Sequence, residues 1–212
     1  LAGSFATAAG ALAGGWLAQN LQSAGLTQEA AYRVILLGYA AAGLLLIALF
    51  LALSAKIEAT NASSTKRVLG LHDSKQVVFK LSALFALDAF AGGLVLQSIM
   101  AYWFHVRFGL QEGLLGTIFF AANILAGISA LLAVRLAAKF GLINTMVFTH
   151  IPSNIMLCLV PLMPTLPLAI GLLLMRFSIS QMDVPTRQSY TMAVVAPDER
   201  AAASGVTTIA RS

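Results

Sequence analysis

The sequence predicts an all-α, polytopic membrane protein, and three observations support this fold class. Of the 212 residues, 59% are hydrophobic and 10% are charged, and the mean hydropathy is +0.87. A water-soluble domain cannot hide that much apolar surface in its core. The apolar residues also form runs of about 20, the length with which a helix crosses a bilayer. Because these runs lack the strict alternation of barrel strands, helices are the remaining spanning element.

Six apolar runs are expected to form transmembrane helices, and a small-residue segment near the C-terminal end of the sequence begins a partial seventh. The third run contains Asp88, the fifth contains His150, and the sixth contains three charged residues. The runs cover residues 1–18, 34–53, 81–104, 113–134, 142–162 and 166–195.

The basic residues predict how these helices are oriented. Short cytoplasmic loops of membrane proteins are enriched in Lys and Arg. If successive connections alternate sides, Arg33 and Arg107 lie on one side of the membrane. The other side receives Lys56, Lys66, Arg67, Lys75, Lys80, Arg135, Lys139 and Arg200. We therefore expect the second side, with the long polar connection of residues 54–76, to face the cytoplasm.

This order of spans resembles the middle of a major facilitator superfamily transporter, and three segments resemble its motifs. "GALAGG" (10–15) is similar to the fifth-helix antiporter motif, with Ala11 in place of a proline. "RLAAKFG" (135–141) resembles the second copy of the gating-loop motif, to which Arg135, Lys139 and Gly141 would belong, with Ala138 in place of an acidic residue. "VPTRQSYTMAVVAPDERAAASG" (184–205) resembles the end of the tenth helix and the loop that follows it.

The resemblance implies a partial helix bundle comprising helices five to ten of twelve and the start of the eleventh. Residues 1–54 would be the last two helices of an N-terminal bundle, and residues 55–77 the cytoplasmic connection between bundles. Residues 78–212 would supply four helices of the C-terminal bundle and the start of a fifth. The remaining helices of the same chain would then be partners of this part.

Four charged residues within the expected spans are the main candidates for substrate binding or ion coupling: Asp88, Arg176, Asp183 and Arg187. Charges inside a membrane are costly, face the bundle interior or a wet cavity, and mark functional sites. In a straight helix the last three form one stripe. Pro185 removes a backbone donor, so we expect a kink beside Asp183.

The resemblance implies that the seventh and tenth helices both line the central cavity, which would bring Asp88 to face this stripe. Our hypothesis is that Asp88, Arg176 and Asp183 form a charge network whose occupancy by proton or substrate shifts the inward and outward states. The alternative is that these charges pair only to hold the bundle together. Arg187 is expected near the inner interface, where its long side chain can reach water.

Other polar and small residues have weaker functional interpretations. Gln97 and Asn123 are amides in apolar helices, which favours hydrogen bonds between helices, with substrate binding as the alternative. Small residues permit close helix approach, and bending during a transport cycle is the alternative role. The glycines concerned are Gly10, Gly14, Gly15, Gly92 and Gly93. The three histidines lie far apart without ligand spacing, so we predict no metal site and no cofactor.

The function that these features indicate is secondary active transport of small organic molecules by alternating access, as proton-coupled efflux. Uptake of a metabolite such as an organic anion or sugar is the first alternative, and a non-transporting membrane scaffold is the second. An enzyme is not expected, because no nucleophile and base or cluster of acidic metal ligands is visible. The basic residues are scattered between apolar runs, which excludes a nucleic-acid partner. We expect a multi-pass protein of the bacterial inner (plasma) membrane.

Overall fold

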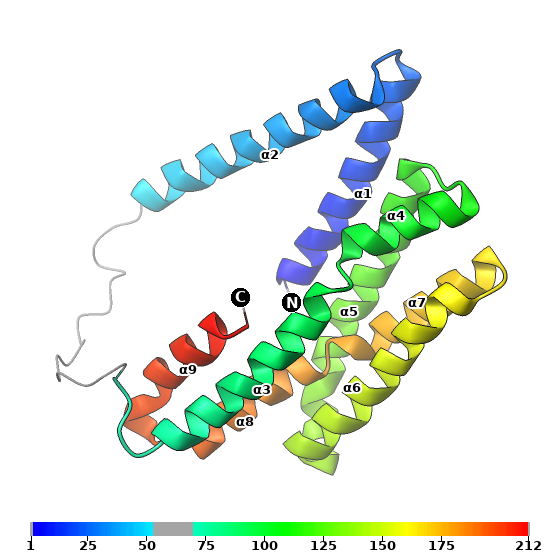
Figure 1. The fold of residues 1–212 in the computed structure, drawn as a ribbon. Coiled ribbons are helices and arrows are strands. Elements are labelled where there is room, and N and C mark those ends of the chain that lie inside the picture. The colour runs from blue at the N-terminus through cyan, green and yellow to red at the C-terminus, as the bar shows by residue number, and fades with distance from the viewer. Residues whose placement is uncertain (1, 53–69, 212) are drawn as a thin grey trace.

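The computed structural model describes residues 2–52 and 70–211, and all regular structure within these ranges is helical (Figure 1). Most of the connection expected at residues 55–77 therefore lies outside the described residues. The helices are α1 (Ala2–Ser23), α2 (Gln28–Leu51), α3 (Lys75–Gly93), α4 (Gln97–Phe108), α5 (Glu112–Phe140), α6 (Leu142–Leu159), α7 (Leu166–Ser180), α8 (Asp183–Val194) and α9 (Arg200–Ile209), with short 3₁₀ turns η3 (Val160–Leu162) and η4 (Pro197–Glu199).

Five helical segments are long and apolar enough to cross a membrane: Gln28–Leu51, Lys75–Phe108, Glu112–Phe140, Leu142–Leu162 and Leu166–Val194. They correspond to five of the expected apolar runs. The remaining run lies in α1, which has 22 residues, and the expected partial seventh helix corresponds to α9, which has 10. The expected fold class, a partial membrane helix bundle, is confirmed.

Two expected spans are not single straight helices. The run at residues 81–104 breaks after Gly93 and resumes at Gln97, so that α3 and α4 form two halves of one crossing. The run at residues 166–195 breaks between Ser180 and Asp183, where α7 gives way to α8. The kink expected beside Asp183 is therefore present.

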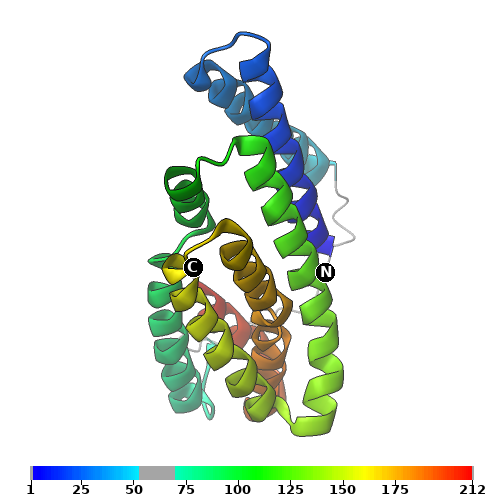
Figure 2. The ribbon, with the colours of Figure 1, turned by 90° about the vertical axis from the view of Figure 1, so that its right-hand side faces the viewer.

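The central helix of the bundle is α5, which packs against α1, α6, α7 and α8 (Figures 1 and 2). Its buried side chains include Leu115, Ile118 and Phe119, which join Phe104 of α4 and Leu173 of α7 in one apolar core. In contrast, α2 extends away from the other helices in Figure 1, and nearly all of its large apolar side chains are exposed. Exposed apolar surface of this kind is compatible with lipid but not with water.

The ends of the helices agree with the alternation assumed in the charge analysis. In Figure 1 the start of α3, the α5–α6 turn and the α8–α9 junction lie at the lower end of the molecule. The α1–α2 and α4–α5 turns lie at the upper end. We call these the inner and outer ends, following the expected orientation.

Candidate functional site

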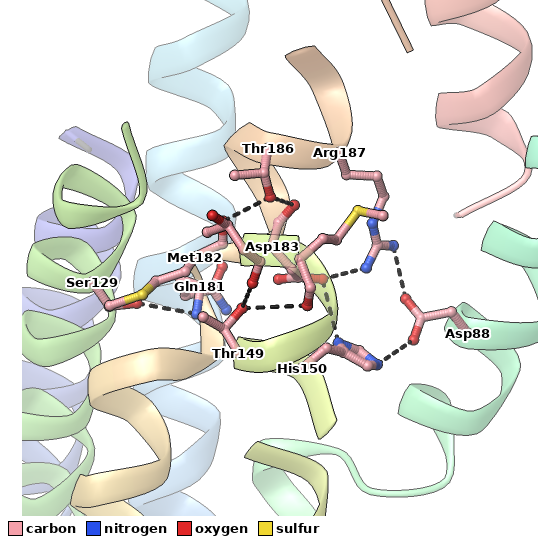
Figure 3. Close-up of polar contacts among 11 residues, drawn as sticks. Asp88, Ser129, Thr149, His150, Gln181, Met182, Asp183, Thr186 and Arg187 are labelled. Atoms are coloured by element: carbon pink, nitrogen blue, oxygen red, sulfur yellow. Dashed lines mark hydrogen bonds and ion pairs between the residues drawn. The ribbon is translucent and has the colours of Figure 1, made fainter. Parts of the chain in front are cut away.

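Four ionisable side chains from three helices meet between α3, α6 and α8 (Figure 3). The Arg187 guanidinium donates to Asp88 Oδ2 at 2.8 Å and to Asp183 Oδ2 through its other terminal nitrogen. The His150 ring bridges the same two carboxylates, with Nε2 3.2 Å from Asp88 Oδ1 and Nδ1 3.4 Å from Asp183 Oδ2. The four groups close a ring in which each cationic or basic group touches both acids. We call these residues the charge network.

The network has a buried half and a half that reaches open space. Asp183 and Arg187 are each 5% exposed, whereas the side chains of Asp88 and His150 are 34% and 35% exposed. All four line a cavity of about 420 Å³. Since both Asp88 and His150 reach this space, a proton or a ligand in the cavity can contact the network directly.

The break between α7 and α8 positions the buried half of the network. Pro185 lacks the N–H that a continuous helix would donate to Gln181. The Ser129 hydroxyl of α5 accepts a hydrogen bond from the Gln181 N–H at 3.2 Å, and the Thr186 hydroxyl donates to the carbonyl oxygens of Met182 and Asp183 at 3.0 and 2.9 Å. The Ser129 contact joins the end of α7 to α5, and the Thr186 hydroxyl adds two hydrogen bonds to the first turn of α8.

Restarting the helix at residue 183 also stabilises the Asp183 carboxylate. Asp183 is the first residue of α8. The unpaired N–H groups and the helix dipole favour negative charge at a helix N-terminus. Arg187 follows four residues later, so its side chain lies on the same helix face. The break therefore turns both groups of α8 toward Asp88 and His150.

In the structure, the charged residues expected on one helix face do not form a single stripe. Asp88 does face Asp183, but the cation between them is Arg187 and not Arg176. Arg187 is buried in the network, which corrects the expectation that its side chain reaches water at the inner interface. The reason is the break at residues 181–182, because the stripe was derived for a straight helix. Arg176 remains in α7 and lines the same cavity.

Arg176 has an unusual environment for an intramembrane cation. Its guanidinium lies 5.1 Å from the centre of the neighbouring Phe177 ring. Its Nε is buried and makes no hydrogen bond, and the described residues provide no ion pair to it. The described residues therefore provide no charged partner for this guanidinium.

His150 was not among the predicted site residues, although a signal was present. It is the one residue of the Asp, Glu, Lys, Arg and His types in the run at residues 142–162. The rule that flagged Asp88 and Arg176, that ionisable residues within a span mark functional sites, applies equally to histidine. The search for histidines close together in sequence could not find a histidine whose partners come from other helices.

The two amide candidates lie outside the charge network. Asn123 is buried in α5, and its amide donates to Phe119 O of the same helix at 2.8 Å. It makes no hydrogen bond to another helix in the part of the chain that the structure describes. Gln97 begins α4 and lines a separate cavity of about 670 Å³ near the outer end. Neither residue contacts Asp88 or Asp183.

The residues matching the gating-loop motif do not form a loop. Arg135 and Lys139 lie in the last turns of α5, which continues to Phe140. The Lys139 ammonium lies 5.3 Å from the centre of the Phe140 ring. Gly141 alone separates α5 from α6, with a φ of +86° that favours glycine. The expected turn is thus reduced to one residue.

Of the five glycines expected at close helix contacts, the structure places one at such a contact. A Cβ on Gly15 of α1 would lie 2.5 Å from the Glu112 carbonyl oxygen and 2.8 Å from Gly116 Cα. At Gly10, Gly14, Gly92 and Gly93, nothing among the described residues lies within 4 Å of such an atom. Gly92 and Gly93 instead end α3, at the break before α4.

A second polar cluster, at the outer end, joins α1 and α2 to the start of α5. Glu112 Oε1 accepts hydrogen bonds from Gln22 at 3.2 Å, from Gln28 at 3.4 Å and from the Tyr32 hydroxyl at 2.9 Å. Gln19 donates to the Gln111 side chain at 2.8 Å. We call these contacts the outer polar cluster.

A third cluster, at the inner end, holds the start of α3 against the α8–α9 junction. The carboxylate of Glu199, which is fully buried, accepts hydrogen bonds from the backbone N–H groups of His72, Asp73 and Ser74. The Ser74 hydroxyl in turn accepts from Ala196 N at 3.0 Å. Burial would raise the pKa of Glu199, but the hydrogen bonds from Ser74, His72 and Asp73 lower it to about 2.

Comparison with known proteins identifies the family of this bundle. The family model of the Major Facilitator Superfamily matches residues 1–212. The chain belongs to the major facilitator superfamily. Members of this superfamily are generally secondary transporters that lie in a lipid bilayer and bind small molecules, and they are generally not enzymes. This superfamily member is accordingly an integral, multi-pass membrane protein.

A related sequence adds to the membrane assignment. An uncharacterised membrane protein of Saccharomyces cerevisiae is 28% identical over 141 residues, which are 66% of this chain and 32% of the yeast protein. The chain thus spans about a third of the length of that relative. No solved structure matches this superfamily member significantly.

Proposed function

We propose that this chain is part of a proton-coupled secondary transporter of small organic molecules that works by alternating access. The observation that carries the proposal is the charge network: two carboxylates, a guanidinium and an imidazole, supplied by three separate membrane segments and open to a cavity. The superfamily supports secondary transport in general. The network supports a proton as the coupling ion.

The charges of the network explain why it would exchange one proton. Two carboxylates against one guanidinium leave a net charge of minus one while His150 is neutral. One proton on the ring makes the network neutral. Net charge is costly in a poorly solvated site, so a bound proton is favoured where the cavity is closed and can leave where water reaches Asp88 and His150.

The same proton would change the contacts between helices. Asp88 belongs to α3, His150 to α6, and Arg187 to α8. Protonation of Asp88 weakens its attraction to Arg187, and protonation of His150 strengthens the attraction of α6 to both acids. Breaks in α3–α4 and α7–α8 lie close to these residues and give each segment a place to bend. A proton thereby biases which helices are held together, as alternating access requires.

Efflux is the first candidate for the direction of transport, on the resemblance of residues 10–15 to an antiporter motif. Uptake of an organic anion or a sugar is the second. The anion is favoured by Arg176, which lines the cavity and has no ion pair among the described residues. A non-transporting scaffold is the third. The bacterial plasma-membrane location expected from the sequence is part of the proposal, and the relative from yeast lends it no support.

The test is substrate-driven proton flux in proteoliposomes that contain the full-length protein. Organic anions, lipophilic cations and sugars are supplied in turn while a pH-sensitive dye reports from the lumen. We expect flux with one class, and its loss in the Asp88→Asn variant. Asp73→Asn, which removes an exposed carboxylate outside the membrane segments, is the matched control and should keep the flux.

Each other result argues against part of the proposal. Flux that survives in Asp88→Asn would remove the network from the coupling path. Substrate exchange without proton flux would replace the proton by another driving ion. Absence of both flux and exchange, with every class of substrate, would favour the scaffold.

A further inference from the structure

The cavity beside the charge network is also lined by a cation that makes no ion pair with the network. Both carboxylates of the cavity lining, Asp88 and Asp183, already contact Arg187 and His150. Arg176 lines the same cavity from α7 and has neither a hydrogen bond at Nε nor an ion pair among the described residues. A permanent positive charge therefore lines the cavity without a carboxylate of the described residues in direct contact with it, and Arg211 lines the same cavity as a second cation outside the network.

An unpaired guanidinium within a membrane segment is unfavourable unless something else binds it. Intramembrane arginines almost always pair with an acid or with carbonyl oxygens. The contact with Phe177 supports the guanidinium on one side but satisfies none of its N–H donors. Five donors in a planar fork match the two oxygens of a carboxylate. Arg176 is thus arranged like a binding group whose ligand is an anion.

We propose that Arg176 is the substrate-binding residue and that the substrate is a small organic anion with a carboxylate group. This inference rests on the proposed transport function and names its substrate class. The volume of about 420 Å³ lies within the range of sites for small molecules. Asn154 and Gln181 line the same cavity and supply amide groups for the rest of the ligand.

Charge balance links this anion to the proton. A monoanion on Arg176 neutralises that residue, and one proton neutralises the charge network. Arg176 and the network sum to zero when neither ligand or both are bound, whereas either one alone leaves one uncompensated charge. Arg211, which also lines the cavity, adds a further positive charge that favours the anion in every state. Anion and proton therefore favour each other's binding, which corresponds to the uptake alternative of the proposed function and not to efflux. The same charges oppose an organic cation.

The cavity also contains a reporter that allows a test without transport. Cys158 is the one cysteine of these 212 residues, is exposed, and lines this cavity. A thiol near an uncompensated cation reacts faster with an anionic reagent than with a cationic one. The probes are the sulfonatoethyl and trimethylammonioethyl methanethiosulfonates, applied to the full-length protein with any cysteine outside these residues replaced by serine. Cys158→Ser gives the background.

We expect the anionic-to-cationic rate ratio to fall about 3- to 10-fold in Arg176→Gln, as for loss of one charge within a Debye length. Arg107→Gln, near the outer end, is the matched control and should leave the ratio unchanged. Acetate, benzoate, succinate and citrate should be screened, and at least one should slow labelling of the wild type, whereas choline should not. Arg176→Lys should keep the rate ratio but lose the protection, because an ammonium lacks the planar fork.

The outcomes distinguish this inference from the transport proposal, since labelling requires neither a gradient nor a transport cycle. A rate ratio that Arg176→Gln leaves unchanged, or protection by choline and not by carboxylates, would overturn the anion site even if proton flux is observed. Protection that requires phosphatidylglycerol in the liposomes and no soluble carboxylate would also overturn it, by assigning Arg176 to a lipid headgroup. If Arg176→Gln fails to fold, loss of protection in Arg176→Lys with an unchanged rate ratio supports the site, and retained protection overturns it.

Discussion

At the scale of single residues, Arg187 provides the positive charge that stabilises the buried Asp183 carboxylate. Both Asp183 and Arg187 are 5% exposed, and each is the other's main charge partner within α8. Removing one member of a buried ion pair strands the other, at a cost of about 3 to 5 kcal/mol. We expect Arg187→Gln to lower the stability of the detergent-solubilised protein by about that much, measured by chemical unfolding.

The double variant isolates the pair as the cause. Asp183→Asn together with Arg187→Gln removes both charges, so no unpaired ion remains in α8. It should be more stable than Arg187→Gln alone. A double variant as unstable as the single one would show that Arg187 acts through its contact with Phe85 or with Asp88 instead.

His150 provides a second residue-scale prediction, which separates coupling from binding. Replacing it with Gln removes a titratable group but leaves the Arg187 contacts with both carboxylates in place. We expect His150→Gln to lose proton-driven accumulation by tenfold or more while retaining exchange of substrate for substrate across the membrane. Asn123→Ala, which removes an amide bonded within its own helix, is the control that should keep accumulation. Loss of exchange as well would assign His150 to substrate binding.

These residues also show how far sequence reasoning reaches at this scale. The prediction that Asp88 faces Asp183 agrees with the geometry, because both lie in spans and such charges need polar partners. The prediction that Arg176, and not Arg187, belongs to the charge network disagrees with the geometry, because it treated residues 166–195 as one straight helix. His150 was missed because its partners are distant in sequence, and only the packing of α3, α6 and α8 brings the three together.

At the scale of helices, hydrophobic runs predict the membrane segments well and their breaks poorly. Pro185 signals the α7–α8 break, since it lacks a donor, and a kink was expected there. The α3–α4 break has weaker signals. Gly92 and Gly93 lower helix propensity, but glycines in membrane helices equally often permit close packing. The sequence alone does not decide between these roles, whereas the structure shows α3 ending at Gly93.

The crossing of α1 and α5 depends on glycine in a way that can be tested. A Cβ on Gly15 would lie 2.8 Å from Gly116 Cα and 2.5 Å from a backbone oxygen, and neither backbone can move as a side chain can. We expect Gly15→Ala to destabilise the protein by about 1 to 3 kcal/mol, as overpacking does. Gly14→Ala is the matched control, with nothing within 4 Å. Its melting temperature should stay the same or rise, because alanine favours the helix.

The Glu199 cluster predicts a dependence of stability on pH at the inner end. The pKa of Glu199 lies at about 2 in the folded protein and near 4.5 for the free group, so the folded state favours the charged form. A depressed pKa contributes stability that is complete above the unfolded value and disappears as the pH falls toward 2. The wild type should therefore be more stable than Glu199→Gln above about pH 5.5, and the difference should shrink between pH 4.5 and 2.

Unfolding curves recorded from pH 7 to pH 2 check this directly. Glu29→Gln, at the exposed start of α2, measures the effect of the same substitution where no such cluster exists. A stability difference between wild type and Glu199→Gln that is constant across the whole range would contradict the assignment of Glu199 as a charged cap of the segment preceding α3.

At the scale of the whole molecule, composition and the spacing of the apolar runs predict the fold class and the order of the spans. The contacts of α1 and α2 with α5 come only from the structure. The hydropathy of a span depends on its own residues alone, so it predicts a membrane segment whatever the packing of the bundle. The way in which α1 and α2 meet α5 depends instead on particular contacts, which are the close approach at Gly15 and the hydrogen bonds of polar side chains near the span ends. Gln19, Gln22, Gln28 and Glu112 were not among the predicted site residues, because amides and acids at such ends are common in any membrane protein.

The outer polar cluster leads to a prediction about the conformational equilibrium. Hydrogen bonds from Gln22, Gln28 and Tyr32 converge on one carboxylate oxygen of Glu112, and hydrogen bonds to charged groups are stronger than those between neutral groups. They tie α1 and α2 to α5 at the end expected to face outward. A transporter that alternates must break these contacts to open on that side. The cluster therefore stabilises the outward-closed state relative to the outward-open state.

Removing the acceptor should shift this equilibrium toward the outward-open state. Loss of about 1 kcal/mol of differential stabilisation raises the ratio of open to closed about fivefold. We expect Glu112→Ala to increase by about that factor the rate at which an impermeant thiol reagent, added outside, modifies Gln97→Cys in a Cys158→Ser background. Gln97 lines the cavity beside Glu112, so it reports on this opening.

The control is Glu29→Ala, which removes an exposed carboxylate at the start of α2 and should leave the rate unchanged. If the rate at Gln97→Cys is unchanged in Glu112→Ala, the cluster serves only to pack α1 and α2 onto α5, and closure of the outer end must come from other contacts.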